Sequence, residues 1–145
     1  MKRLDGKSRT YRSFDEAKDF DGDDAPDWPL EFMHQQMPTG LPPHKLTLKE
    51  GAIIILLRNL NQKKGLCNGT RCVILRMLNN ALFCKVLTGD SKGKKSFIPR
   101  FILTPTANTL PFVLRRRQFP VRLAFAMTIN KAQGELFFQN TEFYK

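Results

Sequence analysis

Hydrophobic and polar positions alternate over short stretches in the middle of the chain, and turn residues separate these stretches. Four of them are candidate strands, at residues 52–58, 70–78, 81–87 and 95–98. Asn79 and Asn80 suit a two-residue hairpin, because asparagine tolerates a positive φ. Residues 89–93 contain two glycines and predict a longer turn. The pattern predicts a small antiparallel barrel whose strands follow one another along the chain.

A different pattern precedes the predicted barrel. Residues 15–27 hold seven acidic residues and one lysine, together with a glycine and a proline, and predict a mobile loop. Such a loop is either a solvated surface segment or a mimic of DNA that screens a basic face. Residues 29–37 follow, and Pro29 stands at a suitable first position for a helix. We expect a short helix packed by three residues at helical spacing, Leu30, Met33 and Met37.

A second apolar run, at residues 121–127, is interrupted only by Arg122. Such a run suits a strand buried on both faces of an α/β sheet, and ligands of these sheets bind beyond the carboxyl ends of the strands. At that end the sequence offers hydroxyl, amide and cationic groups and then a glycine, namely Thr128, Asn130, Lys131, Gln133 and Gly134. These groups suit phosphates and nucleotide edges.

The same segment resembles a helicase motif. Residues 126–134, Ala-Met-Thr-Ile-Asn-Lys-Ala-Gln-Gly, are similar to motif V of superfamily 1B helicases, most closely the Pif family and its relatives in Helitron transposons. Further segments resemble the C-terminal region of that family in the same order, at residues 40–44, 56–60, 65–71, 87–89, 98–100 and 110–112. Several motifs in a fixed order are more specific than any one of them.

The resemblance implies a fold that is mostly β with minor α content. It would consist of an SH3-like small barrel, the 2B domain of these helicases, attached to a partial RecA-like α/β domain. The chain would then divide into four parts. These are an N-terminal piece of the RecA-like domain with an acidic linker (1–28), the helix and the 2B barrel (29–112), the motif V strand and turn of the second RecA-like domain (113–134), and a tail that diverges from the family (135–145).

Motifs that a complete helicase motor needs are not found in the sequence. A phosphate-binding loop has the form Gly-x-x-x-x-Gly-Lys-Ser/Thr after a strand. Gly6-Lys7-Ser8 matches only the end of this pattern, and Met1 stands where the first glycine belongs. An Asp-Glu pair after an apolar strand and the final arginine motif of the family are also missing. The resemblance implies ATP and Mg²⁺ as cofactors of the intact family enzyme. For this chain alone we expect no cofactor and no catalytic residue, with an upstream region or a separate chain supplying the first RecA-like domain.

The net charge of +11 is unevenly distributed. Residues 1–40 carry six lysines and arginines against nine acidic residues, a net charge of −3. Residues 41–145 carry eighteen against four, a net charge of +14. Such basic density favours a nucleic-acid partner, with a solvated surface or an anionic membrane as the alternatives.

By the resemblance, one edge of the predicted barrel would contact the DNA backbone. The end of one strand and the start of the next supply its residues, which are Arg58, Asn59, Asn68, Thr70 and Arg71. Gly69 permits close approach of a backbone, and the alternative for Asn68-Gly69 is a structural turn. Thr128, Asn130 and Lys131 would bind phosphates, while Gln133 and Gly134 would face the nucleotide cleft of an intact motor. The alternative for Lys131 is a surface lysine at a helix start.

Other basic and aromatic residues are secondary candidates. Lys92, Lys94 and Lys95 on a loop, and the cluster at residues 115–117, would each add nonspecific attraction for phosphates. Five phenylalanines are candidates for base stacking, although alternation favours the core for most of them, and these are Phe83, Phe97, Phe101, Phe112 and Phe119.

The cysteines and histidines do not indicate a further site. Cys67, Cys72 and Cys84 form no Cys-x-x-Cys pair, which argues against a disulfide framework and a zinc site, and His34 and His44 lie apart from them in the sequence. We expect no metal site and reduced thiols. No apolar run approaches the roughly 20 residues of a membrane span. We therefore expect no membrane partner and an intracellular protein, nuclear or mitochondrial if the source is eukaryotic.

Three hypotheses for function follow. The first is a DNA-binding C-terminal fragment of an ATP-dependent 5′-to-3′ DNA helicase, not catalytic alone, with single-stranded DNA as its partner. Its processes would be repair, recombination, replication or transposition. The second is a stand-alone basic barrel that binds single-stranded DNA, and the third is a nonfunctional remnant derived from a transposon.

Overall fold

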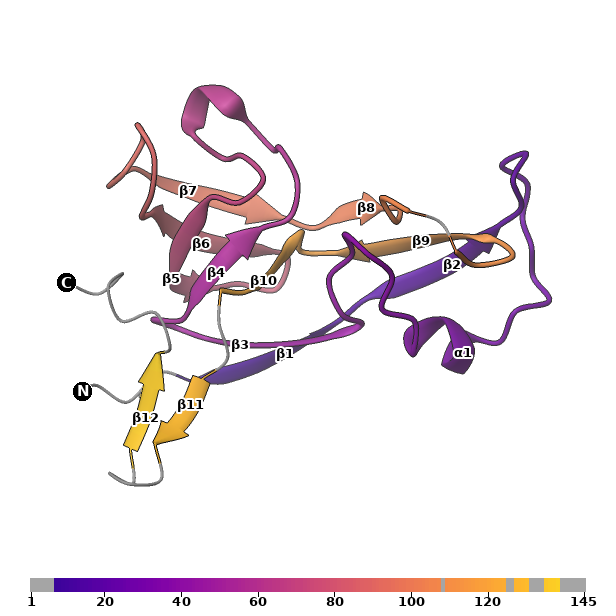
Figure 1. Cartoon of the computed structure of the whole chain (residues 1–145), viewed down its shortest axis with the longest axis horizontal. Coiled ribbons are helices and arrows are strands. Elements are labelled where there is room, and N and C mark those ends of the chain that lie inside the picture. The colour runs from indigo at the N-terminus through magenta and orange to yellow at the C-terminus, as the bar shows by residue number, and fades with distance from the viewer. Residues whose placement is uncertain (1–6, 108, 125–126, 131–134, 139–145) are drawn as a thin grey trace.

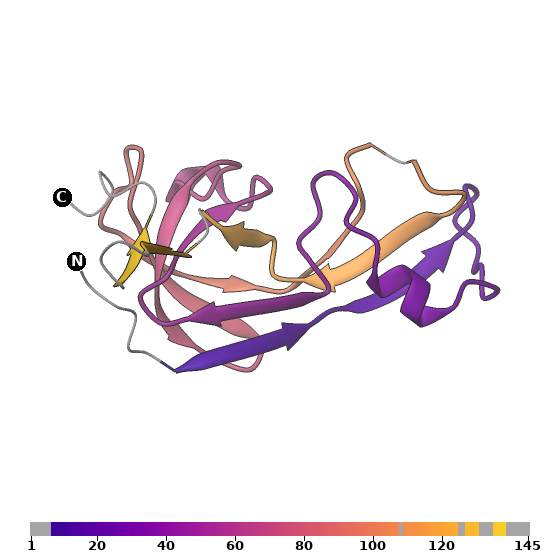
Figure 2. The same ribbon diagram turned by 60° about the horizontal axis from the view of Figure 1, so that its bottom comes forward.

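The computed structural model describes residues 7–107 and 109–124, together with the backbone of residues 127–130 and 135–138. The described part is elongated, with a barrel-like group of strands at one end and helix α1 (Leu30–His34) at the other (Figures 1 and 2). Within these ranges the chain is mostly strand, with α1 and one 3₁₀ turn, η1 (Gln62–Lys64), as the helical elements. The expected fold class, mostly β with minor α content, is therefore confirmed. Among the described residues, no helix has the length and apolar character needed to cross a bilayer.

A five-stranded antiparallel sheet and a two-stranded ribbon enclose the main hydrophobic core at the barrel end. The sheet has the order β10-β4-β5-β6-β7, with bounds β4 Ile53–Leu56, β5 Arg71–Met77, β6 Ala81–Val86, β7 Lys95–Pro99 and β10 Val121–Leu123. The ribbon pairs β1 (Ser8–Arg12) with β3 (Lys45–Lys49). It contributes Tyr11, Leu46 and Leu48 to the core that also contains Ile54 and Leu82. We refer to this part as the barrel end.

A smaller sheet forms the opposite end of the molecule. It has the order β2-β9-β8, with bounds β2 Phe14–Lys18, β8 Phe101–Leu103 and β9 Val113–Gln118. Helix α1 contributes Met33 to its separate core, where Phe112 and Leu114 are fully buried. Trp28 lies over Phe112, with 4.6 Å between the ring centroids. We refer to this part as the helical end.

Three pairs of strands pass from one end to the other with almost no loop between them. Ser13 alone separates β1 from β2, Arg100 alone separates β7 from β8, and two residues separate β9 from β10. The guanidinium of Arg100 donates to the carbonyl of Arg12 at 2.7 Å. It also lies over the rings of Tyr11 and Phe119, at 5.4 and 5.2 Å from their centroids. Arg100 therefore forms one crossing and contacts residues at the other two.

The four strands predicted in the middle of the chain are confirmed, with ends that differ by at most two residues. The backbone N–H of Leu78 donates to the carbonyl of Ala81 at 2.9 Å, so Asn79 and Asn80 are the two turn residues of the predicted hairpin. The expectation of a positive φ there is wrong, because every positive φ among the described residues belongs to a glycine.

The predicted helix is present but shorter, and its packing differs from the expectation. Met33 is buried, whereas Leu30 and Met37 are 56% and 64% exposed. Pro29 precedes the helix as its N-cap residue, with an extended backbone. A helix of five residues has little more than one turn, so it covers the core with a single residue, and the chain leaves the helix before Met37.

The prediction of a mobile acidic loop at residues 15–27 is wrong for its first part. Residues 14–18 form β2, which pairs with β9 so that Asp15 lies opposite Arg116 and Glu16 opposite Arg115. The basic partner strand neutralises the acidic strand, and this pairing is the physical reason for the difference. The later residues form a turn in which the Asp19 carboxylate accepts bonds from the N–H groups of Asp21 and Asp23, at 2.9 and 2.8 Å.

The expected strand over residues 121–127 is also different in the structure. Strand β10 ends at Leu123 and runs antiparallel to β4, and Val121 is buried while Arg122 is exposed. This alternation belongs to a sheet with one buried face and not to a parallel strand buried on both faces. Farther along, β11 (Met127–Asn130) pairs antiparallel with β12 (Glu135–Phe138). The division of the chain into four parts stays a prediction.

Candidate nucleic-acid interface

The loop between β4 and β5 is an exposed polar structure at one edge of the barrel. It is closed at its base by two backbone bonds, from Leu56 N–H to the Thr70 carbonyl at 2.9 Å and from Gly69 N–H to the Leu56 carbonyl at 2.8 Å. Within the loop, Asn61 caps η1 and accepts from Lys64 N–H at 3.3 Å. Gly65 ends η1 with φ +73°, and a Cβ there would lie only 2.5 Å from Cβ of Ser91. These contacts give the loop a defined conformation.

Asn59 and Asn68 meet in this loop, as the sequence predicts. The side-chain oxygen of Asn59 accepts from the backbone N–H of Asn68 at 2.8 Å, and both residues are exposed. Gly69 follows with φ +89°, and no heavy atom lies within 4 Å of where its Cβ would be. The turn conformation explains the glycine, and the open space beside it leaves the backbone accessible. We call Asn59, Asn68 and Gly69 the barrel edge.

Arg58 has a structural role that sequence reasoning did not anticipate. Its guanidinium donates to the carbonyls of Gly40, Leu57 and Thr104, with 3.2 Å to Leu57 and 2.5 Å to Thr104. Burial lowers the pKa of Arg58 from its ordinary value. This arginine joins three segments of backbone, and its contact with DNA stays a prediction.

Thr70 and Arg71 lie beside the barrel edge at the start of β5. The Thr70 hydroxyl donates to the Gly65 carbonyl at 3.0 Å and accepts from Cys67 N–H at 3.1 Å, so it orders the loop. The backbone N–H of Arg71 donates to the hydroxyl of Thr88 at 3.1 Å. The structure therefore brings five of the predicted residues together with Gly69: Arg58, Asn59, Asn68, Thr70 and Arg71.

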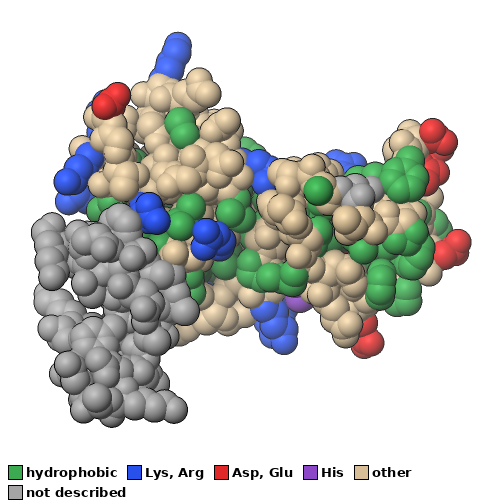
Figure 3. Space-filling model, viewed as in Figure 1, with side chains coloured by type: hydrophobic (Ala, Val, Ile, Leu, Met, Phe, Trp, Pro, Cys, Tyr) green, Lys and Arg blue, Asp and Glu red, His purple; other side chains and the backbone are tan. Residues whose placement is uncertain are grey.

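Two lysines that sequence reasoning left out belong to the same loop. Lys63 and Lys64 are exposed on η1. The signal that could have found them is a pair of adjacent lysines in a polar segment between two apolar strands. In Figure 3 the acidic side chains gather mainly at the helical end and the basic ones mainly over the barrel end. The barrel edge thus belongs to the end of the molecule that carries most of the basic side chains.

The predicted motif V residues contribute little to the described geometry. Thr128 and Asn130 belong to β11, of which only the backbone is described. Lys131, Gln133 and Gly134 lie outside the described residues. Their predicted contacts with phosphates and with a nucleotide cleft stay predictions.

The basic cluster at residues 115–117 is not one surface, because the side chains of β9 alternate. Arg116 is fully buried and Arg117 is exposed. Both nitrogens of the Arg116 fork donate to the Asp15 carboxylate at 2.9 Å, and the remaining N–H groups donate to three carbonyls, those of Met33, Gln36 and Pro42. Arg115 lies 3.4 Å from the carboxylate of Glu16. The prediction that all three attract phosphate is wrong for Arg116, because its guanidinium is buried and hydrogen-bonded inside the protein.

A cluster of Asp15, His34 and His44 is the one group in the described part of the chain with the composition of a metal site. The imidazole rings of His34 and His44 stack in parallel, with 3.6 Å between centroids and an interplanar angle of 4°. Stacked rings direct their nitrogen lone pairs along parallel planes and not toward a common point. Both oxygens of Asp15 already accept from Arg116. This geometry is that of an internal polar network and does not suit a metal ion.

All three cysteines are free thiols. Cys72 and Cys84 point into the barrel core and are almost completely buried. Burial raises the pKa of Cys72 to about 11 and raises the pKa of Cys84 further still. These thiols are therefore inert core residues at neutral pH.

Comparisons with known proteins agree with this arrangement. Residues 31–77, which include the barrel edge, match a family model described as the DNA helicase Pif1, 2B domain. The ATP-dependent DNA helicase PIF1 of Xenopus laevis is 26% identical over an alignment of 145 positions, which covers 92% of this chain but 19% of the relative. The chain thus spans about a fifth of the length of that relative.

Solved structures share the fold. The Pif1 helicase of Candida albicans superposes with a TM-score of 0.59 at 19% identity, covering 91% of this chain and 32% of that one. The Bacteroides Pif1 helicase in complex with ADP-AlF3 and single-stranded DNA has a TM-score of 0.51 at 25% identity, covering 87% and 26%. The matched domain and the relative point to the same group of proteins, and both structures share its fold. The chain is therefore related to Pif1-family DNA helicases and corresponds to a part of them that contains the 2B domain.

Proposed function

We propose that this chain is a DNA-binding part of an ATP-dependent 5′-to-3′ DNA helicase, in which the barrel edge contacts the backbone of single-stranded DNA. The observation that carries the proposal is the ordered, exposed loop of Asn59, Asn68 and Gly69, which lies inside the residues that match the 2B domain. The exposed side-chain amides of Asn59 and Asn68 can donate to phosphate oxygens, and the open space beside Gly69 allows close approach of the ligand. Neighbouring Lys63 and Lys64 add positive charge. The relatives are named as DNA helicases, which supports DNA as the ligand.

The finer parts of the proposal follow from the relationship to helicases. ATP and Mg²⁺ would act in the complete motor, where the second RecA-like domain and its partner domain bind nucleotide. We assign no catalytic residue to this chain. Lys131, Gln133 and Gly134 would face the nucleotide, and Thr128 and Asn130 would assist the grip on DNA. The processes served would be those of the relatives that move along DNA, in the nucleus or in the mitochondrion.

Binding to labelled single-stranded DNA, measured by fluorescence anisotropy across a salt series, tests the proposal. We expect the full chain to bind, with an affinity that falls steeply as salt rises, because phosphate contacts release counterions. The double variant Lys63→Ala/Lys64→Ala should bind more weakly and reduce the salt slope by about 1 to 1.4, since each phosphate contact on a single strand contributes about 0.7.

A matched control distinguishes a local contact from general charge. Arg12 and Lys45 are an exposed basic pair that face each other across β1 and β3, away from the barrel edge. The variant Arg12→Ala/Lys45→Ala removes the same charge and should retain most of the affinity. Equal losses in both double variants would contradict a role for the barrel edge. Addition of ATP and Mg²⁺ to the chain should leave the affinity unchanged, and a nucleotide-dependent change would contradict the absence of a functional nucleotide site in this chain.

A further inference from the structure

The outer face of β5, β6 and β7 presents an aromatic and basic surface that the barrel edge does not explain. On β6 and β7 the inward residues are buried in the barrel core, and these are Leu82, Cys84, Val86 and Ile98. The residues between them point outward and form two rows across the strands. One row is Val73, Lys85 and Lys95, and the other is Arg76, Phe83 and Phe97. We call these two rows the outer face.

A β-bulge places Arg76 on this face. Ile74 lies opposite Cys84, and both are buried, but the register then shifts so that Arg76 lies opposite Phe83. Leu75 is the extra residue. Without the bulge Arg76 would follow Ile74 at a spacing of two residues and point into the core. The bulge therefore turns a cation outward and beside an aromatic ring.

Of the two rings in the aromatic row, Phe97 is exposed and Phe83 is partly buried. Phe97 is 57% exposed, and its ring lies beside that of Phe83 with 4.7 Å between centroids and an interplanar angle of 38°. Two neighbouring rings on the outside of a sheet leave apolar area in water that a ligand with flat faces can cover. Nucleic-acid bases are such ligands, and aromatic residues on sheets bind them by stacking.

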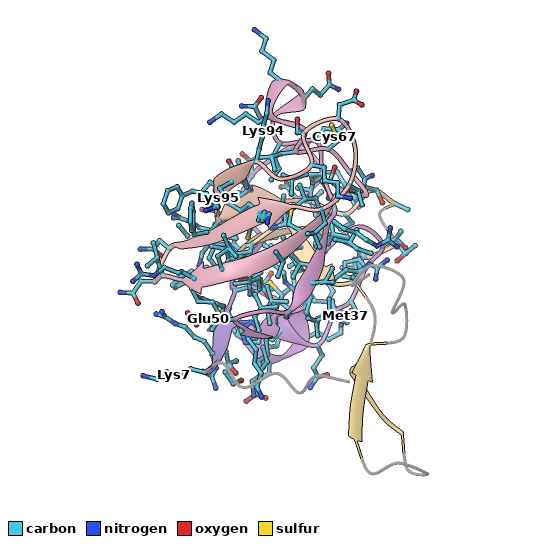
Figure 4. All side chains as sticks on the ribbon, turned by 90° about the vertical axis from the view of Figure 1, so that its left-hand side faces the viewer. Lys7, Met37, Glu50, Cys67, Lys94 and Lys95 are labelled. Carbon is cyan, nitrogen blue, oxygen red and sulfur yellow. The ribbon has the colours of Figure 1, made fainter. Side chains whose placement is uncertain are left out.

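The charges around the two rings favour a negatively charged partner. Lys85 and Lys95 lie directly opposite each other across β6 and β7, an arrangement of like charges that opposes pairing. Within the described residues neither lysine has a carboxylate within 4.0 Å. Residues 51–107 contain ten lysines and arginines and a single acidic residue, Asp90. In Figure 4 Lys94 and Lys95 lie on the upper part of the barrel, away from Glu50 at its lower edge.

We propose that the outer face is a second contact surface for single-stranded DNA, on which bases stack against Phe97 and Phe83 while phosphates lie near Lys85, Lys95 and Arg76. The proposal rests on the proposed function, because it extends the same ligand beyond the barrel edge. Arg71 and Val73 alternate with the buried Cys72 and Ile74, so β5 connects the barrel edge to the outer face. Phe83, Lys85, Lys95 and Phe97 lie outside residues 31–77, which match the 2B domain.

Length-dependent binding tests this surface separately from the barrel edge. The full chain and its variants are titrated with oligothymidylates of about 5 and about 15 nucleotides, lengths near the two limits of single-strand sites. We expect Phe97→Ala to weaken binding of the longer oligonucleotide by at least about fivefold, the lower end of base-stacking contributions, with a smaller effect on the shorter one. Phe14→Ala removes a phenylalanine that is even more exposed than Phe97, from β2 at the helical end, and is the matched control. It should leave both affinities unchanged.

Photochemical cross-linking of the wild-type chain adds a measurement that no folding defect can affect. A 5-iodouracil-containing oligonucleotide of about 15 nucleotides, a length within the range of single-strand sites, should cross-link to the peptides that contain Phe83 or Phe97. Cross-links confined to other peptides would overturn the proposal. So would equal affinities for Phe97→Ala and Phe14→Ala, a result that would leave the barrel edge intact as a DNA site and assign the outer face to a protein partner. Absence of salt-dependent binding by the wild-type chain would instead reject both proposals together.

Discussion

The two ends of the molecule are stabilised in different ways, one by an apolar core and the other by a buried ion pair. The barrel end encloses a core made almost entirely of apolar side chains and leaves its charges outside. The helical end buries a guanidinium and a carboxylate, while Phe14, Phe20 and Ile102 remain 73%, 69% and 54% exposed there. A hydrophobic core tolerates small changes in shape, whereas a buried charge requires every partner to be in place. The barrel end is therefore the self-sufficient part, and the helical end is the part that depends on specific contacts.

Loss of the Arg116 side chain should have the largest effect on stability. The variant Arg116→Met leaves the Asp15 carboxylate buried without its cation and removes the guanidinium donor from three carbonyls. We expect a decrease in the free energy of unfolding of about 3–5 kcal/mol, the usual result of breaking a buried pair. Urea denaturation followed by circular dichroism measures it. Arg117→Met changes the next residue of β9, which is exposed, and should stay within about 0.5 kcal/mol of the wild type. Similar losses for both variants would contradict the structural role of Arg116.

Truncation in the barrel core should have the next largest effect and tests whether the two ends unfold together. Leu82→Ala removes a fully buried side chain and should cost about 2–5 kcal/mol, whereas Leu78→Ala, at a position 40% exposed in the adjacent hairpin, should cost much less. Trp28 is the only tryptophan and lies at the helical end. Its fluorescence and the circular dichroism of the strands should give coincident transitions in Leu82→Ala. Separate midpoints would show that the helical end unfolds independently.

A change of pH should produce the smallest effect, and it should come from the helical end. Burial lowers the pKa of His44, and the charges of His34, Arg116 and Lys45 lower it further against the opposite effect of Asp15. The unfolded chain then binds a proton at His44 more readily than the folded chain, so stability is complete above about pH 6.5 and falls as the pH decreases below it.

Melting temperatures measured between pH 7.5 and pH 5 check this prediction. His44→Gln keeps a polar partner near the Ser13 hydroxyl, which lies 2.8 Å from Nδ1 of His44. The variant should lose part of the decrease seen in the wild type. An unchanged pH profile in the variant would assign the effect to other groups.

The barrel end could be predicted from the sequence because its strands and turns are determined locally. Alternation of polar and apolar residues located β4 to β7, and the Asn79-Asn80 hairpin followed from two adjacent residues. The meeting of Asn59 with Asn68 followed in turn, since adjacent strands bring the ends of their loop together.

The helical end could not be predicted in the same way because its contacts join distant residues. Asp15 and Arg116 are 101 positions apart, and in the sequence each belongs to a run of like charges that resembles a solvated surface. The sequence also did not decide which face of its strand Phe97 occupies. A shift of one residue in register exchanges the buried and exposed faces of a strand. The burial of Ile98 decides that Phe97 points outward, and the sequence offers both residues as core candidates.

The crossings at Ser13, Arg100 and Phe119 form a stiff junction between the barrel end and the helical end. Each crossing has at most two residues between strands, and the guanidinium of Arg100, which forms one crossing, contacts residues at the other two. A hinge needs residues that can change their backbone torsions without breaking contacts, and this junction offers few of them. A force applied to the barrel end, for example by a bound strand of DNA, would therefore be transmitted to the helical end. The two ends would rotate together as one rigid body.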